Sequence, residues 1–273
     1  MKEIFSNLRF EIIRAGHAIC DRSWNYTTFK YPFCRLYCIT KGEGFVTHHG
    51  RRFRLGPNVL HLMPPHLPVD RQFCPCRMEV YYLHFSAFLP GHLDFFSLLK
   101  PCCHLNIECG GMLESLVKRL VESKSFKSEA PEDLLLTDGS MRLLLEPFAR
   151  AAAREDLKGS LSILIRFKPL FDYIEGHLSS TIRLAELGKV AGLHPTYLSN
   201  SFSRLLGVSP LQYVCRRRIE QAGALLLEGR QSMAQIAEKL GFVDAFHFSK
   251  TFKKITGHPP SSYRKWLANG AER

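Results

Sequence analysis

Two stretches in the last third of the sequence repeat the same kinds of side chain at the same spacing. They are GLHPTYLSNSFSRLLGVSPLQY at residues 192–213 and GFVDAFHFSKTFKKITGHPPSSY at residues 241–263. Hydroxyl and amide groups can hydrogen-bond to base edges, a phenyl ring can contact a thymine methyl group, and cations suit phosphates. The side chains with this chemistry are Thr196, Ser199, Asn200 and Ser203 with the cation Arg204, and Phe246, His247, Ser249 and Lys250 with the cations Lys253 and Lys254. Together they predict contacts with the bases and phosphates of nucleic acid.

The two stretches are copies of one pattern. Phe202 matches Phe252 at an offset of 50 residues, and before the turn Gly192 matches Gly241 at an offset of 49. A repeat of this kind indicates one structural unit used twice. Each copy is typical of a short helix, a tight turn that opens with glycine, and a second amphipathic helix. This is the helix-turn-helix pattern, whose second helix lies in the major groove of DNA.

The elements that must position these side chains are helices joined by short turns. The pattern predicts helices at residues 167–178, 182–190, 194–206, 210–228, 232–240, 244–255 and 261–269. A side-chain acceptor at a helix start satisfies a free backbone N–H group, and glycine is favoured just past a helix end. Residues suited to the starts are Thr181, His194, Ser209, Ser232 and Asp244, and those suited to the ends are Gly207, Gly229 and Gly257.

These stretches, together with the LAELGKVA and MAQIAEKL segments that precede them, resemble the DNA-binding domain of the AraC/XylS family of bacterial transcription regulators. The match is fullest in the second copy, at Ile236-Ala237, Gly241-Phe242, Phe248-Ser249-Lys250, Phe252-Lys253, Gly257, Pro260 and Tyr263-Arg264. Two positions depart from the family pattern: Gly188 stands where alanine is usual, and His194 replaces a common serine.

The resemblance implies roles for positions in both copies. By position, the family's base-reading residues correspond to Thr196, Ser199, Asn200, Ala245, Phe246, Ser249 and Lys250. Helix 210–228 would hold the two units so that their second helices enter successive major grooves about 34 Å apart. One monomer would then read an asymmetric site in double-stranded DNA. The resemblance also implies RNA polymerase as a partner.

The first part of the chain predicts strands. Residues 8–90 alternate short β-type runs with turns such as Gly42-Glu43-Gly44, which is typical of a sandwich or barrel. The segment RLYCITKGEGFVTHHGRRFRLGPNVLHLMPPHLPV resembles the cupin-type sensor barrel often fused to this DNA-binding domain. A barrel mouth suits a small molecule held by aromatic and polar side chains. The candidates are Trp24, Arg35, His66, Tyr82 and His84, and family analogy suggests a sugar.

Two leucine-rich amphipathic stretches follow, at residues 112–120 and 132–156. Apolar residues at helical spacing must be buried against something. Packing on the barrel and a homodimer interface both satisfy this requirement, and we expect a homodimer.

A metal-dependent enzyme is the main alternative. Cupin enzymes bind a metal through an H-x-H pair, a glutamate and a later histidine, whereas this chain has vicinal His48 and His49. Neighbouring strand residues point to opposite faces, so the two cannot both face one metal. We therefore expect no metal, no cofactor and no catalytic residues. The alternative of a cupin-type metal-dependent enzyme or carbohydrate-binding protein with a basic helical tail stays open.

Composition and charge fit a DNA-binding protein. The chain has 273 residues and a net charge of +12, of which residues 166–273 carry +8 and residues 1–165 carry +4. Excess positive charge attracts polyanions. We find neither a secretion signal nor an apolar run of about 18 residues that could span a bilayer, so we expect a cytoplasmic protein without membrane contact. The nine cysteines read as reduced thiols, with Cys74-Pro-Cys76 and Cys102-Cys103 as possible redox or metal elements.

The sequence thus predicts an α+β protein of two domains. A cupin-like effector-sensing barrel occupies residues 1–100, a helical connection 101–165, and an AraC-type DNA-binding domain with two helix-turn-helix units 166–273. The function predicted is sequence-specific transcription regulation in response to a small molecule. The effector, the operator and the sign of regulation stay open.

Overall fold

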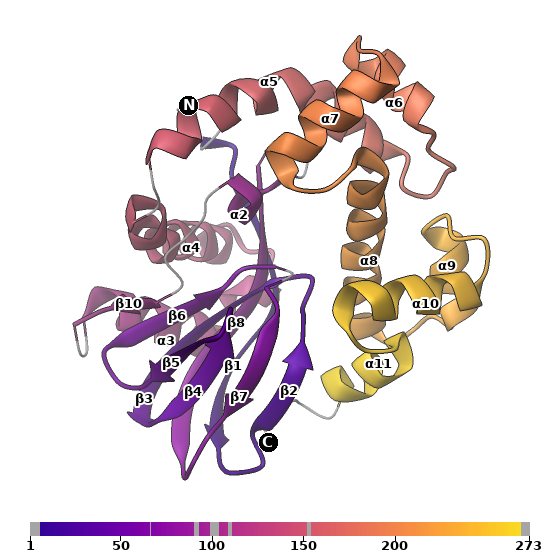
Figure 1. The fold of residues 1–273 in the computed structure, drawn as a ribbon. Coiled ribbons are helices and arrows are strands. Elements are labelled where there is room, and N and C mark those ends of the chain that lie inside the picture. Colours follow the sequence, from indigo (N-terminus) through magenta and orange to yellow (C-terminus); the bar gives the residue numbers. More distant parts are fainter. Residues whose placement is uncertain are drawn as a thin grey trace. The chain divides into compact units, whose positions relative to one another are not determined.

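The computed structural model describes residues 6–65, 67–89, 93–98, 104–108, 111–151 and 154–268 (Figure 1). The chain forms two compact units that are each discontinuous in sequence. The sheet unit contains residues 9–87 and 101–152, and the helical unit contains residues 1–8, 88–100 and 153–268. The predicted α+β class, with strands first and helices after, is confirmed. The domain limits at residues 100 and 165 remain predictions.

Two sheets make up most of the sheet unit. The first has the order β1 (Arg9–Cys20), β8 (Met78–Leu89), β3 (Cys34–Gly42), β6 (Val59–Met63) and β10 (His104–Asn106). The last two residues of β8, Phe88 and Leu89, belong to the helical unit and pair there with β9 (Leu93–Asp94). The second has the order β2 (Asn25–Phe29), β7 (Val69–Phe73), β4 (Gly44–His48) and β5 (Arg51–Leu55). Within the described residues the predicted cupin-like barrel is therefore built as two sheets and not as one closed ring of strands.

Side-chain alternation decides which strand faces are buried. In β4, Gly44, Val46 and His48 are buried, while Phe45 and Thr47 between them are half-buried. This is the two-residue period of a sheet with one face on the core. The largest side chains of that core are fully buried or nearly so: Trp24, Leu36, Ile39, Leu55 and Phe85.

Gly42 shows why the hairpin between β3 and β4 needs glycine. Its φ is +75°, in the left-handed region that glycine adopts most readily. A Cβ atom at this position would lie 1.9 Å from the carbonyl oxygen of Arg77. Any side chain here would force the backbones of β3 and β8 apart.

Three helical segments complete the sheet unit: α3 (Met112–Ser123), the 3-10 turn η1 (Ser125–Lys127) and α4 (Pro131–Ala151). Helices α3 and α4 pack on each other and on β1. The face that α4 buries consists of Ser140, Met141, Leu144, Leu145 and Phe148. Packing of residues 112–120 and 132–151 within the sheet unit is thus observed. The predicted second stretch continued to residue 156, but residues 152 and 153 lie outside the described residues and Arg154 begins α5.

The helical unit contains α2 (Phe95–Leu98), α5 (Arg154–Gly176), α6 (Leu184–Ala191), α7 (Pro195–Leu206), α8 (Pro210–Glu228), α9 (Met233–Lys239), α10 (Ala245–Thr256) and α11 (Pro260–Ala268). Helix α5 begins 13 residues before the predicted start at residue 167. Gly159 and Ser160, which favour a boundary near this position, lie inside this helix. A glycine lowers the stability of a helix but does not have to end it. No helix in the described part of the chain is long and apolar enough to cross a membrane.

Candidate nucleic-acid interface

Helices α6 and α7 form the first helix-turn-helix, called here the first motif. Gly192 ends α6 with φ +61°, and its N–H group donates to the carbonyl oxygens of Gly188 and Lys189. His194 caps α7 and accepts, through Nδ1, a hydrogen bond of 3.4 Å from the N–H of Thr196. Leu198 is fully buried on the inner face of α7. The turn and the inward side chains therefore fix which face of α7 is outward.

Helices α9 and α10 form the second motif. Ser232 and Gln235 cap α9 reciprocally, with hydrogen bonds of 2.8 and 3.2 Å between side chain and backbone. Asp244 caps α10 by accepting a 2.6 Å hydrogen bond from the N–H of His247. Phe248 and Phe252 are fully buried. The second motif thus repeats the inner construction of the first.

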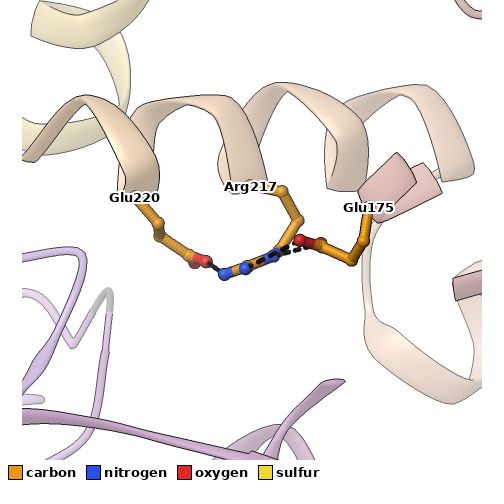
Figure 2. Close-up of polar contacts among 3 residues, drawn as sticks. All are labelled: Glu175, Arg217 and Glu220. Carbon is orange, nitrogen blue, oxygen red and sulfur yellow. Dashed lines mark hydrogen bonds and ion pairs between the residues drawn. The ribbon is translucent and has the colours of Figure 1, made fainter. Parts of the chain in front are cut away.

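Helix α8 connects the two motifs and packs on both α7 and α10. Its Arg217 is almost completely buried and donates through Nε to Oε1 of Glu175 at 2.7 Å and through Nη2 to Oε2 of Glu175 at 3.2 Å. Its Nη1 pairs with Glu220 (Figure 2). Burial alone would lower the pKa of Arg217, but the carboxylates of Glu220 and Glu175 raise that pKa above its ordinary value. The guanidinium also lies 4.8 Å from the ring centroid of Phe88. This network holds α8 against α5.

The next residue of α8 fixes the second motif. Arg218 donates through Nη1 to the carbonyl oxygen of Gly241 at 2.9 Å and through Nη2 to that of Ser180 at 2.6 Å. Gly241 has φ +66°, and a Cβ atom there would lie 2.7 Å from the carbonyl oxygen of Ser179. The turn of the second motif is therefore bonded directly to α8.

The predicted DNA-contacting residues lie on the outward side of α7 and α10. Exposed side chains are Thr196, Asn200, Arg204, Phe246, His247, Lys250, Lys253 and Lys254, and half-buried ones are Ser199, Ser203, Ala245 and Ser249. The buried residues, Leu198 and Phe202 in α7 and Phe248 and Phe252 in α10, are spaced by four and share the opposite face. One surface of each helix therefore carries the polar and basic groups. Their contacts with DNA remain predictions.

Two exposed side chains were not selected from the sequence. Val243, in the turn before α10, is 88% exposed, and Tyr197 in α7 is 56% exposed. In the repeat Leu193 corresponds to the buried Phe242, since the N–H of each donates to the matching carbonyl oxygen, of Gly188 and of Ala237. Val243 is the one extra residue between that position and the helix cap in the second copy, so the repeat provides no counterpart for it.

The candidate ligand-binding residues gather in the sheet unit around Tyr37. The β3–β8 register pairs Arg35 with His84 and Tyr37 with Tyr82, and the Tyr82 and His84 rings lie 5.1 Å apart. Arg35 donates to the Tyr37 hydroxyl at 3.5 Å, and the Trp24 ring lies 6.0 Å from that of Tyr37. All of these side chains are buried. Tyr37 itself was not selected from the sequence, and His66 lies outside the described residues.

Histidines form a second cluster in the sheet unit. His48 is buried whereas its neighbour His49 is exposed, and His61 and His104 approach each other through their Nδ1 atoms at 3.3 Å. Burial lowers the pKa of His48 to about 4, and it lowers the pKa of His61 and His104 as well. The imidazoles are therefore neutral at neutral pH. Among the described residues, no group of three or more His, Cys, Asp and Glu side chains could hold a metal ion.

No disulfide joins any two cysteines in the described part of the chain. Cys20, Cys34, Cys38 and Cys74 are buried and Cys76 is exposed, whereas Cys102, Cys103 and Cys109 lie outside the described residues. Burial raises the pKa of the Cys38 thiol to about 12. A thiol with such a pKa is an inert part of the core at neutral pH.

Comparisons with known proteins cover both units. A family model described as an AraC-like ligand binding domain matches residues 14–160, more than half of the chain, and a helix-turn-helix domain model matches residues 187–265. The uncharacterised HTH-type transcriptional regulator YobQ of Bacillus subtilis is 35% identical over 95 residues, which are 35% of this chain and 39% of that protein. The chain thus spans about two fifths of that relative's length.

Two further proteins are similar over nearly the whole chain. The Msm operon regulatory protein of Streptococcus mutans is 22% identical over 97% of this chain and 95% of that protein. The crystal structure of unsaturated fatty acid bound ToxT from Vibrio cholerae superposes with a TM-score of 0.63 at 16% identity, covering 97% of this chain and 98% of that one. This second likeness concerns the fold.

Proposed function

This chain belongs to the AraC family of transcription regulators, and from that premise we propose that it binds specific sequences in double-stranded DNA and responds to a small molecule. The observation that carries the proposal is the doubled helix-turn-helix. Both outward helices bury apolar side chains on one side and present polar and basic side chains on the other. One such motif suits one major-groove segment, so two motifs suit two segments.

Base reading and phosphate binding fall to different residues in this proposal. Asn200 is exposed and carries the amide that pairs with adenine in the major groove. Arg204, one turn later, suits a phosphate. Base-reading residues such as Asn200 would confer sequence preference, and phosphate-binding residues such as Arg204 would add affinity for any duplex.

The experiment is selection of bound duplexes from a random pool, followed by affinity measurements on the enriched sequence. Asn200→Ala should lose about 1–3 kcal/mol on that sequence and little on scrambled DNA. Arg204→Ala should weaken both alike and reduce the dependence of affinity on salt. A pool from which no sequence is enriched would contradict the proposal, and equal losses from both variants would contradict the division of roles.

The effector would bind beside the buried group of Arg35, Tyr37, Tyr82 and His84. A sugar, suggested by family analogy, would use hydroxyl contacts there. A carboxylic acid, the ligand class named for the ToxT structure, would instead pair with the Arg35 guanidinium. Arg35→Gln should abolish stabilisation by a carboxylate ligand and reduce stabilisation by a sugar much less. Measuring the thermal unfolding temperature of the unaltered protein and of this variant with a sugar and with a carboxylic acid distinguishes the two kinds of effector.

A homodimer, RNA polymerase contact and a cytoplasmic location complete the proposal. Support for the dimer lies on α4, where Leu135 and Leu143 are 74% and 46% exposed and the exposed Gly139 lies midway between them. Residues spaced by four share one helix face. Leu135→Glu with Leu143→Glu should convert a dimer to a monomer in sedimentation experiments, and an unchanged mass would remove α4 from the interface.

A further inference from the structure

The second motif exposes two neighbouring apolar side chains. Val243 is 88% exposed and Phe246 is 77% exposed. They stand three residues apart, one in the turn and one in the first turn of α10. Scattered single apolar residues on a surface are ordinary. Here two largely exposed ones stand within four residues of each other, at the start of the helix that carries the exposed cations of the motif.

Folding of the second motif does not require these two side chains. The inner face of α10 is held by the buried Phe248 and Phe252. The start of α10 is fixed by the Asp244 cap, and the turn is bonded to Arg218 through the carbonyl oxygen of Gly241. The ring of His247 lies 5.7 Å from that of Phe242, directed back toward the turn. Phe246, in contrast, is directed into solvent.

Charge on the same helix indicates what covers this pair. Lys250, Lys253 and Lys254 are exposed on α10. Cations beside an apolar tip are complementary to a duplex groove, where phosphates line the edges and bases lie between them. Of the groups that base pairs present in the major groove, the C5 methyl of thymine is the apolar one.

We infer that Val243 and Phe246 read thymine methyl groups, so that the second motif selects thymine-bearing steps in its half of the DNA site. This inference rests on the proposed function and adds the base class and a further specificity-determining residue, Val243. The first motif has different chemistry at the corresponding positions. Val243 has no counterpart there, because the first motif is one residue shorter between Gly192 and the cap His194, and Thr196 stands in the place of Phe246. The methyl group of Thr196 is a much smaller apolar surface than the Phe246 ring, so the main methyl reading is assigned to the second motif.

The test replaces thymidine by deoxyuridine, one position at a time, in the sequence enriched from a random duplex pool. This exchange removes the methyl group and leaves every hydrogen-bonding group in place. Burial of one methyl group is worth about a fourfold change in affinity. We expect losses of about this size at one to three positions within a single half-site, and smaller changes in the other half-site.

Variants connect the loss to the two side chains. Val243→Ala with Phe246→Ala should bind thymine and uracil duplexes equally, because the groups that distinguish them are gone. The matched control is Tyr197→Ala, which removes an exposed aromatic side chain from the first motif and should retain the full thymine preference of the second. Since all three side chains are exposed, thermal unfolding of the variants should match that of the unaltered protein.

The outcomes separate this inference from the proposed function. An enriched sequence whose affinity is unchanged by every deoxyuridine overturns the inference and leaves the proposed function standing. Equal deoxyuridine losses in the unaltered protein and in the Val243→Ala, Phe246→Ala variant also overturn it. A random pool without any enriched sequence refutes the proposed function itself.

Discussion

The two helix-turn-helix motifs share their interior and differ on their outer surface. Both second helices bury side chains four residues apart, Leu198 with Phe202 in α7 and Phe248 with Phe252 in α10. Both end in a glycine with positive φ. Outside, the second motif has Lys250 and Lys253 at the positions where the first has Asn200 and Ser203. The shared interior is what the fold requires, and the outer surface is where recognition can vary.

The motifs also differ in how they are attached. In the first motif, Phe202 lies within 5.8 Å, between ring centroids, of Phe167 and Phe171 in α5 and 5.5 Å from Tyr213 in α8. In the second motif, Phe252 meets Tyr263 of α11 at 5.2 Å. The first motif is thus packed on the long helix α5, whereas the second is packed on the last helix of the described chain.

Deleting the two buried rings should show this difference most strongly. Phe202→Ala and Phe252→Ala each remove a fully buried ring, which costs about 3–5 kcal/mol of unfolding free energy. We expect the larger loss for Phe202→Ala, because its cavity would be lined by rings from two other helices. Denaturant unfolding measures both, with Tyr197→Ala as the exposed aromatic control. A larger loss for Phe252→Ala would reverse the comparison.

The Arg217 network should affect both motifs together. Arg217→Met leaves the carboxylates of Glu175 and Glu220 without their shared cation, which should cost about 3 kcal/mol. Because α8 packs on α7 and on α10, affinity for both half-sites should fall. Arg216→Met, at the preceding half-buried position, is the matched control. Loss of binding at only one half-site would show that α8 does not couple the motifs.

Much of the helical unit was predictable because its signals are local. Predicted helices at 194–206 and 244–255 correspond to α7 (Pro195–Leu206) and α10 (Ala245–Thr256), since caps and glycine turns mark their limits in the sequence. The start of α5 was missed because glycine is a weak helix breaker. The exposure of Val243 was missed because this residue is an extra one in the turn of the second copy, and the first copy has no counterpart to compare it with.

The sheet unit was less predictable because strand partners are distant in sequence. Arg35 and His84 stand opposite each other in the β3–β8 register, but they are 49 residues apart in the chain. Alternation indicates which residues share a face within one strand and does not indicate the partner strand. Tyr37 was therefore missed, although it lies between the candidates that were selected.

The salt dependence of DNA binding should show that the outer surface of α10 makes more phosphate contacts than that of α7. Replacing Lys253 and Lys254 by glutamine removes two phosphate-contacting cations from the second motif, so the slope of log affinity against log salt should fall by about two. Arg204→Gln in the first motif should lower the slope by about one. Titrations at several salt concentrations measure both. Equal changes would mean that the lysines do not all contact phosphates.

The smallest expected effect concerns the two caps. Asp244 accepts a 2.6 Å hydrogen bond, whereas the His194 contact is 3.4 Å long and correspondingly weak. Asp244→Ala should therefore cost about 1 kcal/mol of stability, and His194→Ala only a few tenths. Hydrogen exchange at the N–H groups of His247 and Thr196 measures the local effect. Asp244→Asn retains an acceptor and removes a negative charge near the expected phosphates, so it should keep stability and strengthen binding to any duplex. If it weakened binding instead, the start of α10 would not face the DNA.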